Sequence, residues 1–197
     1  MNKKERIELI KQIEKDLGYG RFIHTLGVAE TSANLAMRWG VDPSAAEQAG
    51  LLHDCAKCLP LAKMRKICLK EGMILNDYEQ DSAALLHSKA GSVLARTKYG
   101  VTDEEVLSAI KYHTTGRPAM STLEKIVFTA DYIEPGRESA PDLPQVRRMA
   151  YENLDACVFK ILGDTLSYLA RSDAPADPMT QKTYDYYASI QKLQKEN

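Results

Sequence analysis

The side chains best suited to chemistry in this sequence are its few histidines. There are four of them: His24, His53, His87 and His113. His53 is followed directly by Asp54, and another carboxylate, Asp131, lies in the otherwise apolar run FTADYI, where burial is costly unless a partner or metal compensates the charge. Neutral imidazoles and carboxylates suit zinc, iron or manganese, whereas calcium prefers an all-oxygen shell. A lone histidine is usually an ordinary core or surface residue, but four beside an HD dipeptide favour a metal site.

Helices must position these side chains, because apolar residues recur at three- and four-residue steps nearly throughout. Of the five helices expected before residue 100, the first, second, fourth and fifth end near positions 18, 39, 72 and 99. Asp42-Pro43 is a suitable start for the third, which carries AAEQAGLLHDCAK, and Ser44 with Glu47 could add a capping box. The stretch over about 79–99 could be broken near His87.

The second half of the chain has the same character. Thr102 with Glu105, and Ser121 with Glu124, match the capping-box pattern and open helices that end near residues 113 and 133. The Pro-rich segment ESAPDLP leads to a long helical segment over about 145–171, and SDAPADP precedes a last helix ending near 194. Strand alternation and hairpin turns are lacking. We therefore predict a single all-α domain over residues 1–197.

Composition narrows the classes of function. The chain has 197 residues, 44% of them hydrophobic and 27% charged, which is typical of a folded domain with a real core. With a net charge of -1, the chain lacks the excess of basic residues of a typical nucleic-acid binder. No apolar run is long enough to span a membrane, and the charged N-terminal segment offers no signal peptide, so we expect a cytoplasmic protein without nucleic-acid or membrane partners.

The cysteines raise an alternative. Cys55 and Cys58 form a CxxC motif, CAKC, which could indicate thiol redox chemistry or half of a zinc site. No second CxxC is present, and disulfides are rare in the reducing cytoplasm. We expect ordinary thiols.

At this point the sequence resembles a known family. The order H…HD…D, seen in His24, His53-Asp54 and Asp131, resembles the HD superfamily of metal-dependent phosphohydrolases. The strings RFIHTLGVAETSANLA, AGLLHDCAK, LLHSKAG, YHTTGRPAMSTLEKIVFTADYIEPGR and ARSDAPADPMT narrow the resemblance to the YqeK family over about residues 21–180. Members of that family are bacterial symmetrical bis(5′-nucleosyl)-tetraphosphatases, which split diadenosine tetraphosphate into two ADP. The resemblance implies an HD-domain helical bundle with this activity.

The resemblance also implies a ligand set. The residues expected to bind the metal are His24, His53, Asp54 and Asp131. The family implies iron, although manganese or another divalent transition metal would suit the same donors. His87 and His113 would complete the cavity, either by holding a second metal or by contacting phosphate and the attacking water, and the sequence does not choose between these roles. The family comparison further favours a homodimer, and apolar faces left over among so many helices would supply the surface for it.

Several residues near these ligands could bind the phosphates. Lys57 lies three residues after Asp54, on nearly the same helical face, and is otherwise a solvated lysine. Arg137 follows a Pro-Gly turn that could aim its guanidinium inward. The further candidates are Arg21, Gly27, Thr114 and Gly116, with Ala176, Asp177, Pro178 and Thr180 implied by the family's C-terminal loop. Gly27 suggests close approach of a ligand or of backbone, because glycine costs a helix about 1 kcal/mol. Without a phosphate-binding role, the TTG turn at residues 114–116 is merely a helix stop. The ADPMT string at residues 176–180 departs from the loop usual in the family.

Two other functions compete with this hypothesis. The first is an HD phosphohydrolase for another nucleotide, such as a nucleoside monophosphate, a dNTP or a guanosine alarmone. The HTTG…DYIEPGR combination argues against it, because those groups are not expected to share it. The second is a nucleotide sensor without turnover, although such modules usually lack a ligand and none is missing here.

Overall fold

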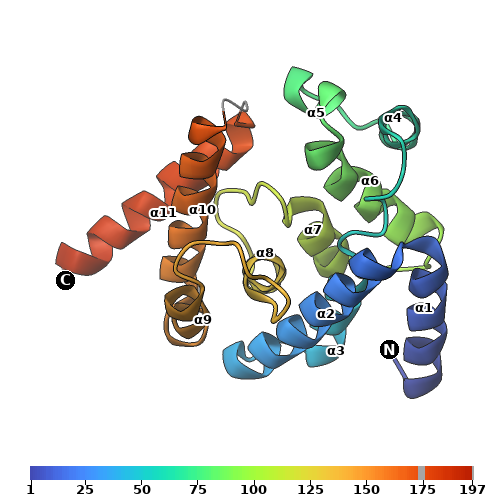
Figure 1. Ribbon diagram of the computed structural model, residues 1–197, viewed down its shortest axis with the longest axis horizontal. Coiled ribbons are helices and arrows are strands. Elements are labelled where there is room, and N and C mark those ends of the chain that lie inside the picture. Colours follow the sequence, from blue (N-terminus) through green and yellow to red (C-terminus); the bar gives the residue numbers. More distant parts are fainter. Residues whose placement is uncertain (173–175, 197) are drawn as a thin grey trace.

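The computed structural model, which describes residues 1–172 and 176–196, is built from α-helices and contains no strand within those ranges (Figure 1). The eleven helices are α1 (Lys3–Asp16), α2 (Tyr19–Trp39), α3 (Pro43–Leu52), α4 (Leu61–Lys70), α5 (Asp77–Asp81), α6 (Ala83–Thr97), α7 (Glu104–Tyr112), α8 (Thr122–Ile133), α9 (Leu143–Glu152), α10 (Leu154–Arg171) and α11 (Pro178–Glu196). The all-α prediction is confirmed.

Helix starts follow local chemistry, with two corrections. Ser121 accepts a hydrogen bond from the Glu124 N–H, and the Glu124 side chain accepts from the Ser121 N–H, which confirms that capping box. The Thr102–Glu105 box is wrong, because Asp103 caps α7 through the N–H groups of residues 105 and 106. The Ser44–Glu47 box is also wrong. Asp42 accepts the Ser44 N–H, so its carboxylate caps α3 instead.

Three helix boundaries also differ from the prediction. The stretch over 79–99 breaks at Ser82, where the backbone is extended, and His87 lies inside α6. The segment over 145–171 is interrupted at Asn153, whose extended backbone ends α9 and whose side chain caps α10 by accepting from the Ala156 N–H. Helix α3 stops at Leu52, so HDCAKC lies in turns. This last difference lets His53 and Asp54 point together toward the interior.

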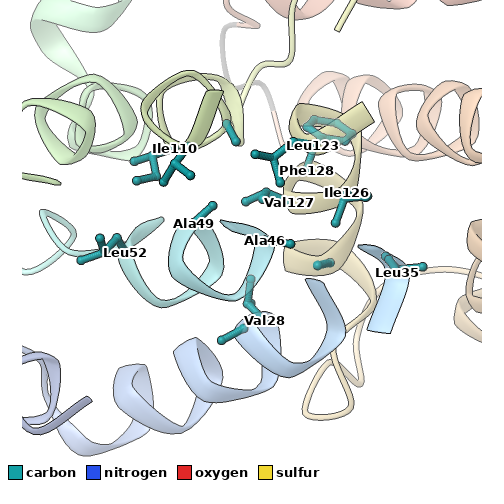
Figure 2. Packing of buried hydrophobic residues seen from close by; sticks show 14 of the residues in the cluster. Val28, Leu35, Ala46, Ala49, Leu52, Ile110, Leu123, Ile126, Val127 and Phe128 are labelled. Atoms are coloured by element: carbon teal, nitrogen blue, oxygen red, sulfur yellow. The ribbon is translucent and has the colours of Figure 1, made fainter. Parts of the chain in front are cut away.

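The core that holds the site lies where α2, α3, α7 and α8 pack together. Helix α2 packs along α3 and against α8, while α7 packs against α8. Figure 2 shows Val28 of α2, Ala49 of α3, Ile110 of α7 and Val127 of α8 in this packing. All four are buried. Such close packing resists shifts of the backbone, so it holds the polar side chains in place at the helix ends.

The remaining helices cover this core from two sides. Helices α10 and α11 pack on each other, and α10 also contacts α8 and α9 (Figure 1). Helix α4 packs on α6, with Met64, Cys68 and Leu86 in a second, smaller apolar cluster. No helix of the described residues combines the length and the hydrophobicity needed to cross a membrane.

Candidate active site

The four histidines and two aspartates converge from five parts of the chain. His24 is on α2, His53 and Asp54 follow α3, and His87 is on α6. His113 follows α7, and Asp131 is on α8. The six predicted residues are therefore brought together, although their longest separation in sequence exceeds half of the chain.

His53 and His113 are oriented by the same local device. Each immediately follows a helix, and each ring nitrogen Nδ1 bonds a backbone carbonyl three residues earlier. His53 Nδ1 lies 2.7 Å from the Gly50 oxygen, and His113 Nδ1 lies 2.8 Å from the Ile110 oxygen. A carbonyl only accepts, so Nδ1 carries the proton in both rings and Nε2 offers its lone pair to the centre of the site.

Three side chains surround one part of this centre. His24 Nε2 lies 3.0 Å from Asp131 Oδ1, and His53 Nε2 lies 3.9 Å from the same oxygen. One donor atom from each of these residues falls within 4.8 Å of the others, which is a spacing that one metal ion could bridge.

Asp54 lies between this group and the other two histidines. Its Oδ2 accepts a 2.8 Å hydrogen bond from Arg21 Nη1 and lies 3.5 Å from His53 Nε2. Its Oδ1 lies 3.0 Å from His87 Nε2 and 3.8 Å from His113 Nε2. Donor atoms of His53, Asp54 and His113 form a second group that a metal could hold. The carboxylate of Asp54 thus contacts both halves of the site: the half with His24, His53 and Asp131, and the half with His87 and His113.

The donor atoms fit a metal ion. His24 Nε2, His53 Nε2 and Asp54 Oδ1 are buried and, although two of them lie 3.0 Å from another atom of the site, none forms a hydrogen bond of suitable geometry within the described residues. Leaving a buried polar atom unpaired costs about 1–3 kcal/mol, so three in one place require an explanation. The set contains imidazole nitrogens and carboxylate oxygens and no thiolate, which suits iron, manganese or zinc.

The charge states also suit metal binding. Burial raises the pKa of Asp54 and Asp131, but the surrounding imidazoles outweigh it and hold both pKa values far below the ordinary range. Burial lowers the pKa of His53, yet the two carboxylates raise it again to above its usual value. Burial lowers the pKa of His87 and takes the pKa of His113 to about 3. The site therefore offers ionised carboxylates and, at His87 and His113, neutral imidazoles.

Cationic and hydroxyl groups border these donors. Lys57 Nζ lies 3.3 Å from His87 Nε2, and Arg137 donates from Nη2 to Asp131 Oδ1 at 2.6 Å. The Thr114 hydroxyl lies 3.2 Å from His113 Nε2. A cavity of about 770 Å³ opens beside them, with Asp131, Thr114 and Arg137 in its wall. The structure thus places Arg21, Lys57, Thr114 and Arg137 beside the donors.

Two other residues predicted to bind phosphate, Gly27 and Gly116, do not offer a free binding group beside the metal-donor atoms. A Cβ added to Gly27 would lie 2.5 Å from Glu134 Oε2, so this protein's own side chain, rather than a ligand, occupies the open face of that glycine. Gly116 has a positive φ of 62°, and its N–H already donates to the Tyr112 carbonyl, which removes that N–H as a phosphate ligand.

The C-terminal loop is placed on the N-terminal end of α11. Asp177 is buried and accepts hydrogen bonds from the Met179 N–H and the Asn76 side chain. Thr180 is buried, whereas Pro178 is exposed and Ala176 is half-buried. No hydrogen bond in the described residues joins these four to the histidines, so the structure leaves their contact with a nucleotide untested.

Sequence reasoning missed one residue of the site, Glu134. Its carboxylate Oε1 lies 3.1 Å from His24 Nδ1, and its Oε2 accepts the Gly136 N–H at 2.5 Å. The signal was present, since Glu134 lies in the EPGR string directly after the Asp131 helix. The string was interpreted only as a turn that aims Arg137.

Comparisons with known proteins agree with this geometry. Residues 21–136 match the family model of the HD domain. The symmetrical bis(5′-nucleosyl)-tetraphosphatase of Bacillus subtilis (strain 168) is 38% identical over 96% of this chain and 99% of its own. The enzyme of that name from Staphylococcus aureus (strain NCTC 8325 / PS 47) is 40% identical over 92% of this chain and 94% of its own. A crystal structure from Clostridium acetobutylicum, described as a predicted HD superfamily hydrolase involved in NAD metabolism, superposes with a TM-score of 0.90 at 39% identity, covering 94% of this chain and 97% of that one.

Proposed function

Since this chain belongs to the HD-domain family and, within it, to the symmetrical bis(5′-nucleosyl)-tetraphosphatases, we propose that it hydrolyses diadenosine tetraphosphate to two ADP. Related dinucleoside polyphosphates are included in the proposed substrate class. The observation that carries the proposal is the buried group of unpaired donor atoms on His24, His53 and Asp54, next to a cavity whose wall contains two arginines and three carboxylates.

The metal ion is proposed to bind His24, His53, Asp54 and Asp131. When bound, a divalent transition metal acts as a Lewis acid and lowers the pKa of water toward neutrality. Asp54 and Asp131 supply ionised oxygens, because their pKa values are held low by the neighbouring imidazoles. His53 supplies a fixed Nε2, since its Nδ1 is bonded to the Gly50 carbonyl.

The cationic side chains are proposed to bind the polyphosphate. Arg21 and Arg137 now pair with Asp54 and Asp131, which places both guanidiniums directly beside the proposed metal ligands. Guanidinium groups bind phosphate oxygens through paired N–H donors, and such contacts offset the negative charge that develops during attack on phosphorus. Lys57 adds an ammonium next to His87. Symmetric cleavage requires attack at one of the two inner phosphates, so that each product keeps two.

We further propose that the physiological metal is iron and that one or two ions bind. The second ion, if present, would use His87 and His113, whose Nε2 atoms lie 3.0 Å apart. The alternative role of this pair is to contact phosphate and the attacking water. The number of metal ions per chain, measured on purified protein, decides between the two roles.

We also propose that the protein works in the cytoplasm as a homodimer and that its whole length acts as one domain. All four cysteines are free, as expected in a reducing compartment. Tyr19, Ile23 and Met37 are exposed on one face of α2, which supplies apolar surface for a second copy. The main hydrophobic cluster extends from Leu9 of α1 to Tyr187 of α11. Light scattering on the purified protein tests the dimer.

The decisive experiment combines metal analysis with product analysis. The full-length protein, loaded with iron or manganese, is incubated with diadenosine tetraphosphate and the products are separated. We expect ADP alone; an equal mixture of ATP and AMP would contradict symmetric cleavage. A nucleoside monophosphate, a dNTP and a guanosine alarmone are assayed in parallel, and strong turnover of any of these with none of diadenosine tetraphosphate would overturn the proposal. Nucleotide binding without turnover of any substrate would favour the sensor function instead.

A further inference from the structure

Glu134 contacts the active site without facing the cavity. It directly follows α8, is only 4% exposed, and lies three residues after Asp131. Asp131 Oδ1 lies 3.0 Å from Nε2 of His24, while Glu134 Oε1 lies 3.1 Å from Nδ1 of the same ring. Two carboxylates from adjacent turns therefore lie at opposite edges of one imidazole, and only Glu134 is hydrogen-bonded to it.

The space for this carboxylate is made by a glycine. Gly27 follows His24 by three residues on α2, and a Cβ there would lie 2.5 Å from Glu134 Oε2 and 3.3 Å from its Cδ. A Cβ does not come within 3.0 Å of another residue's heavy atom, so any larger residue would push the carboxylate aside. Glycine in a helix costs about 1 kcal/mol, and the approach of Glu134 provides the reason for it at this position.

The backbone that carries Glu134 is also held in place. The Gly136 N–H donates to Glu134 Oε2, so the carboxylate folds back onto the backbone of the turn that follows α8. Arg147 of α9 donates to the carbonyl oxygens of Ile133, Glu134 and Arg137 at 2.9, 3.0 and 3.2 Å. A carboxylate with so little freedom can hold its partner ring in one orientation.

We infer that Glu134 is a positioning residue for the metal: it accepts the Nδ1 proton of His24 and thereby fixes both the tautomer and the angle of that ring. Nε2 of His24 is then deprotonated and directed at the ion. Outer carboxylates of this kind orient histidine ligands, and their loss typically lowers metal affinity about 10–100-fold. The inference rests on the proposed metal-dependent function and adds Gly27 as the residue that makes room for the contact.

The test measures metal binding rather than turnover. The full-length protein is stripped with a chelator and titrated with Co²⁺, whose visible absorption reports both affinity and ligand geometry, in the absence of nucleotide. We expect Glu134→Ala to bind Co²⁺ about 10–100-fold more weakly and to change its spectrum. The Co²⁺ affinity of Glu134→Gln should fall between those of the wild type and Glu134→Ala. The amide oxygen can accept from His24, but the amide NH₂, itself a donor, then faces the Gly136 N–H. Glu124→Gln removes a carboxylate at the other end of α8 and should leave Co²⁺ binding unchanged.

A double-mutant cycle tests the role of Gly27. Gly27→Ala should weaken Co²⁺ binding in the wild-type background and add nothing in the Glu134→Ala background, because the displaced carboxylate is then already absent. Gly20→Ala is the matched control, since a Cβ at that position of α2 meets no atom within 4 Å.

The result that would overturn the inference is wild-type Co²⁺ affinity and spectrum in a folded Glu134→Ala variant. Equal, additive effects of Gly27→Ala in both backgrounds would also overturn it, because Gly27 would then act independently of Glu134. If neither Glu134 variant folds, weaker Co²⁺ binding by Gly27→Ala than by Gly20→Ala supports the inference, and wild-type binding by both overturns it. Failure of the wild type to cleave diadenosine tetraphosphate while it binds Co²⁺ would contradict the proposed substrate, not this contact.

Discussion

Helix α8 carries a carboxylate near each of its ends, buried at Glu124 and half-buried at Asp131, and their partners differ. At the N-terminal end, Glu124 is 1% exposed and its two oxygens accept hydrogen bonds from the Ser121 N–H at 2.7 Å, from Arg117 at 2.9 Å and from the Ser108 hydroxyl. At the C-terminal end, Asp131 accepts from Arg137 but also faces two imidazoles.

The difference teaches how to distinguish a structural polar cluster from a functional one. Around Glu124 every buried donor has an acceptor within the protein, so the cluster is complete as it stands. Around Asp131 the buried Nε2 atoms of His24 and His53 have no hydrogen-bond partner among the described residues, and a further ion would complete the site. A satisfied cluster adds stability, whereas an unsatisfied one keeps binding capacity for a ligand.

The largest expected effect concerns Asp54, which touches both halves of the site. Asp54→Ala should remove bound metal and lower the hydrolysis of diadenosine tetraphosphate by more than about 10³-fold, the upper range for losing one preorganised electrostatic contact. His53→Ala should do the same. Metal content and ADP formation are measured together on each variant. Retained turnover in either variant would contradict the assignment of that residue as a metal ligand.

Removal of the metal should come next in size. A ligand at about one hundred times its dissociation constant stabilises the folded state by about 2.7 kcal/mol. Unfolding by urea, followed with and without added Mn²⁺, measures this difference for the wild type. The gain should disappear in Asp54→Ala but persist in Glu124→Gln. An equal gain in both variants would place the stabilising ion elsewhere.

The opposite end of α8 should respond in stability only. Glu124→Gln leaves at least one buried donor without its acceptor, so we expect a loss of about 1–3 kcal/mol in the free energy of unfolding. Metal content and the rate of ADP formation should stay at wild-type levels after correction for folded protein. A loss of metal in this variant would break the distinction between the two ends.

The smallest effect should follow replacement of the CAKC thiols. Burial raises the pKa of the Cys55 thiol far above its ordinary value, so it stays protonated and unreactive. Cys58 is exposed and free. Activity of the Cys55→Ser, Cys58→Ser double variant should match the wild type in reducing and oxidising buffer. Abolished turnover with retained metal would instead support a thiol-based role.

Some of this site was predictable because its pattern is local. The HD dipeptide, a histidine near the start of a helix and an aspartate in an apolar run each stand out locally. The resemblance to the HD superfamily grouped His24, His53-Asp54 and Asp131 as one ligand set, and the structure brings them together. The Ser121 cap was predictable for the same reason, since both of its partners lie within one turn of chain.

Other features depend on contacts distant in sequence. The sequence placed a possible break near His87, whereas the helix runs through His87 and the break comes at Ser82. There Arg65 of α4 contacts the Gln80 carbonyl and the Asp81 side chain just before the break. Gly27 likewise indicated that some group comes close, but a glycine does not specify which group, and its neighbour Glu134 is more than one hundred residues away in the sequence.

The three hydrogen bonds from Arg147 have a consequence for dividing this protein into parts. The HD match covers residues 21–136, yet the guanidinium that secures the last turn of that region comes from α9, and Arg137 lies one residue beyond the match. A chain shortened to the matched segment would keep every proposed metal ligand and lose both arginines. We therefore expect the smallest working enzyme to extend beyond the shared module, and expect that transplanting this chemistry into another protein also needs the helix that follows.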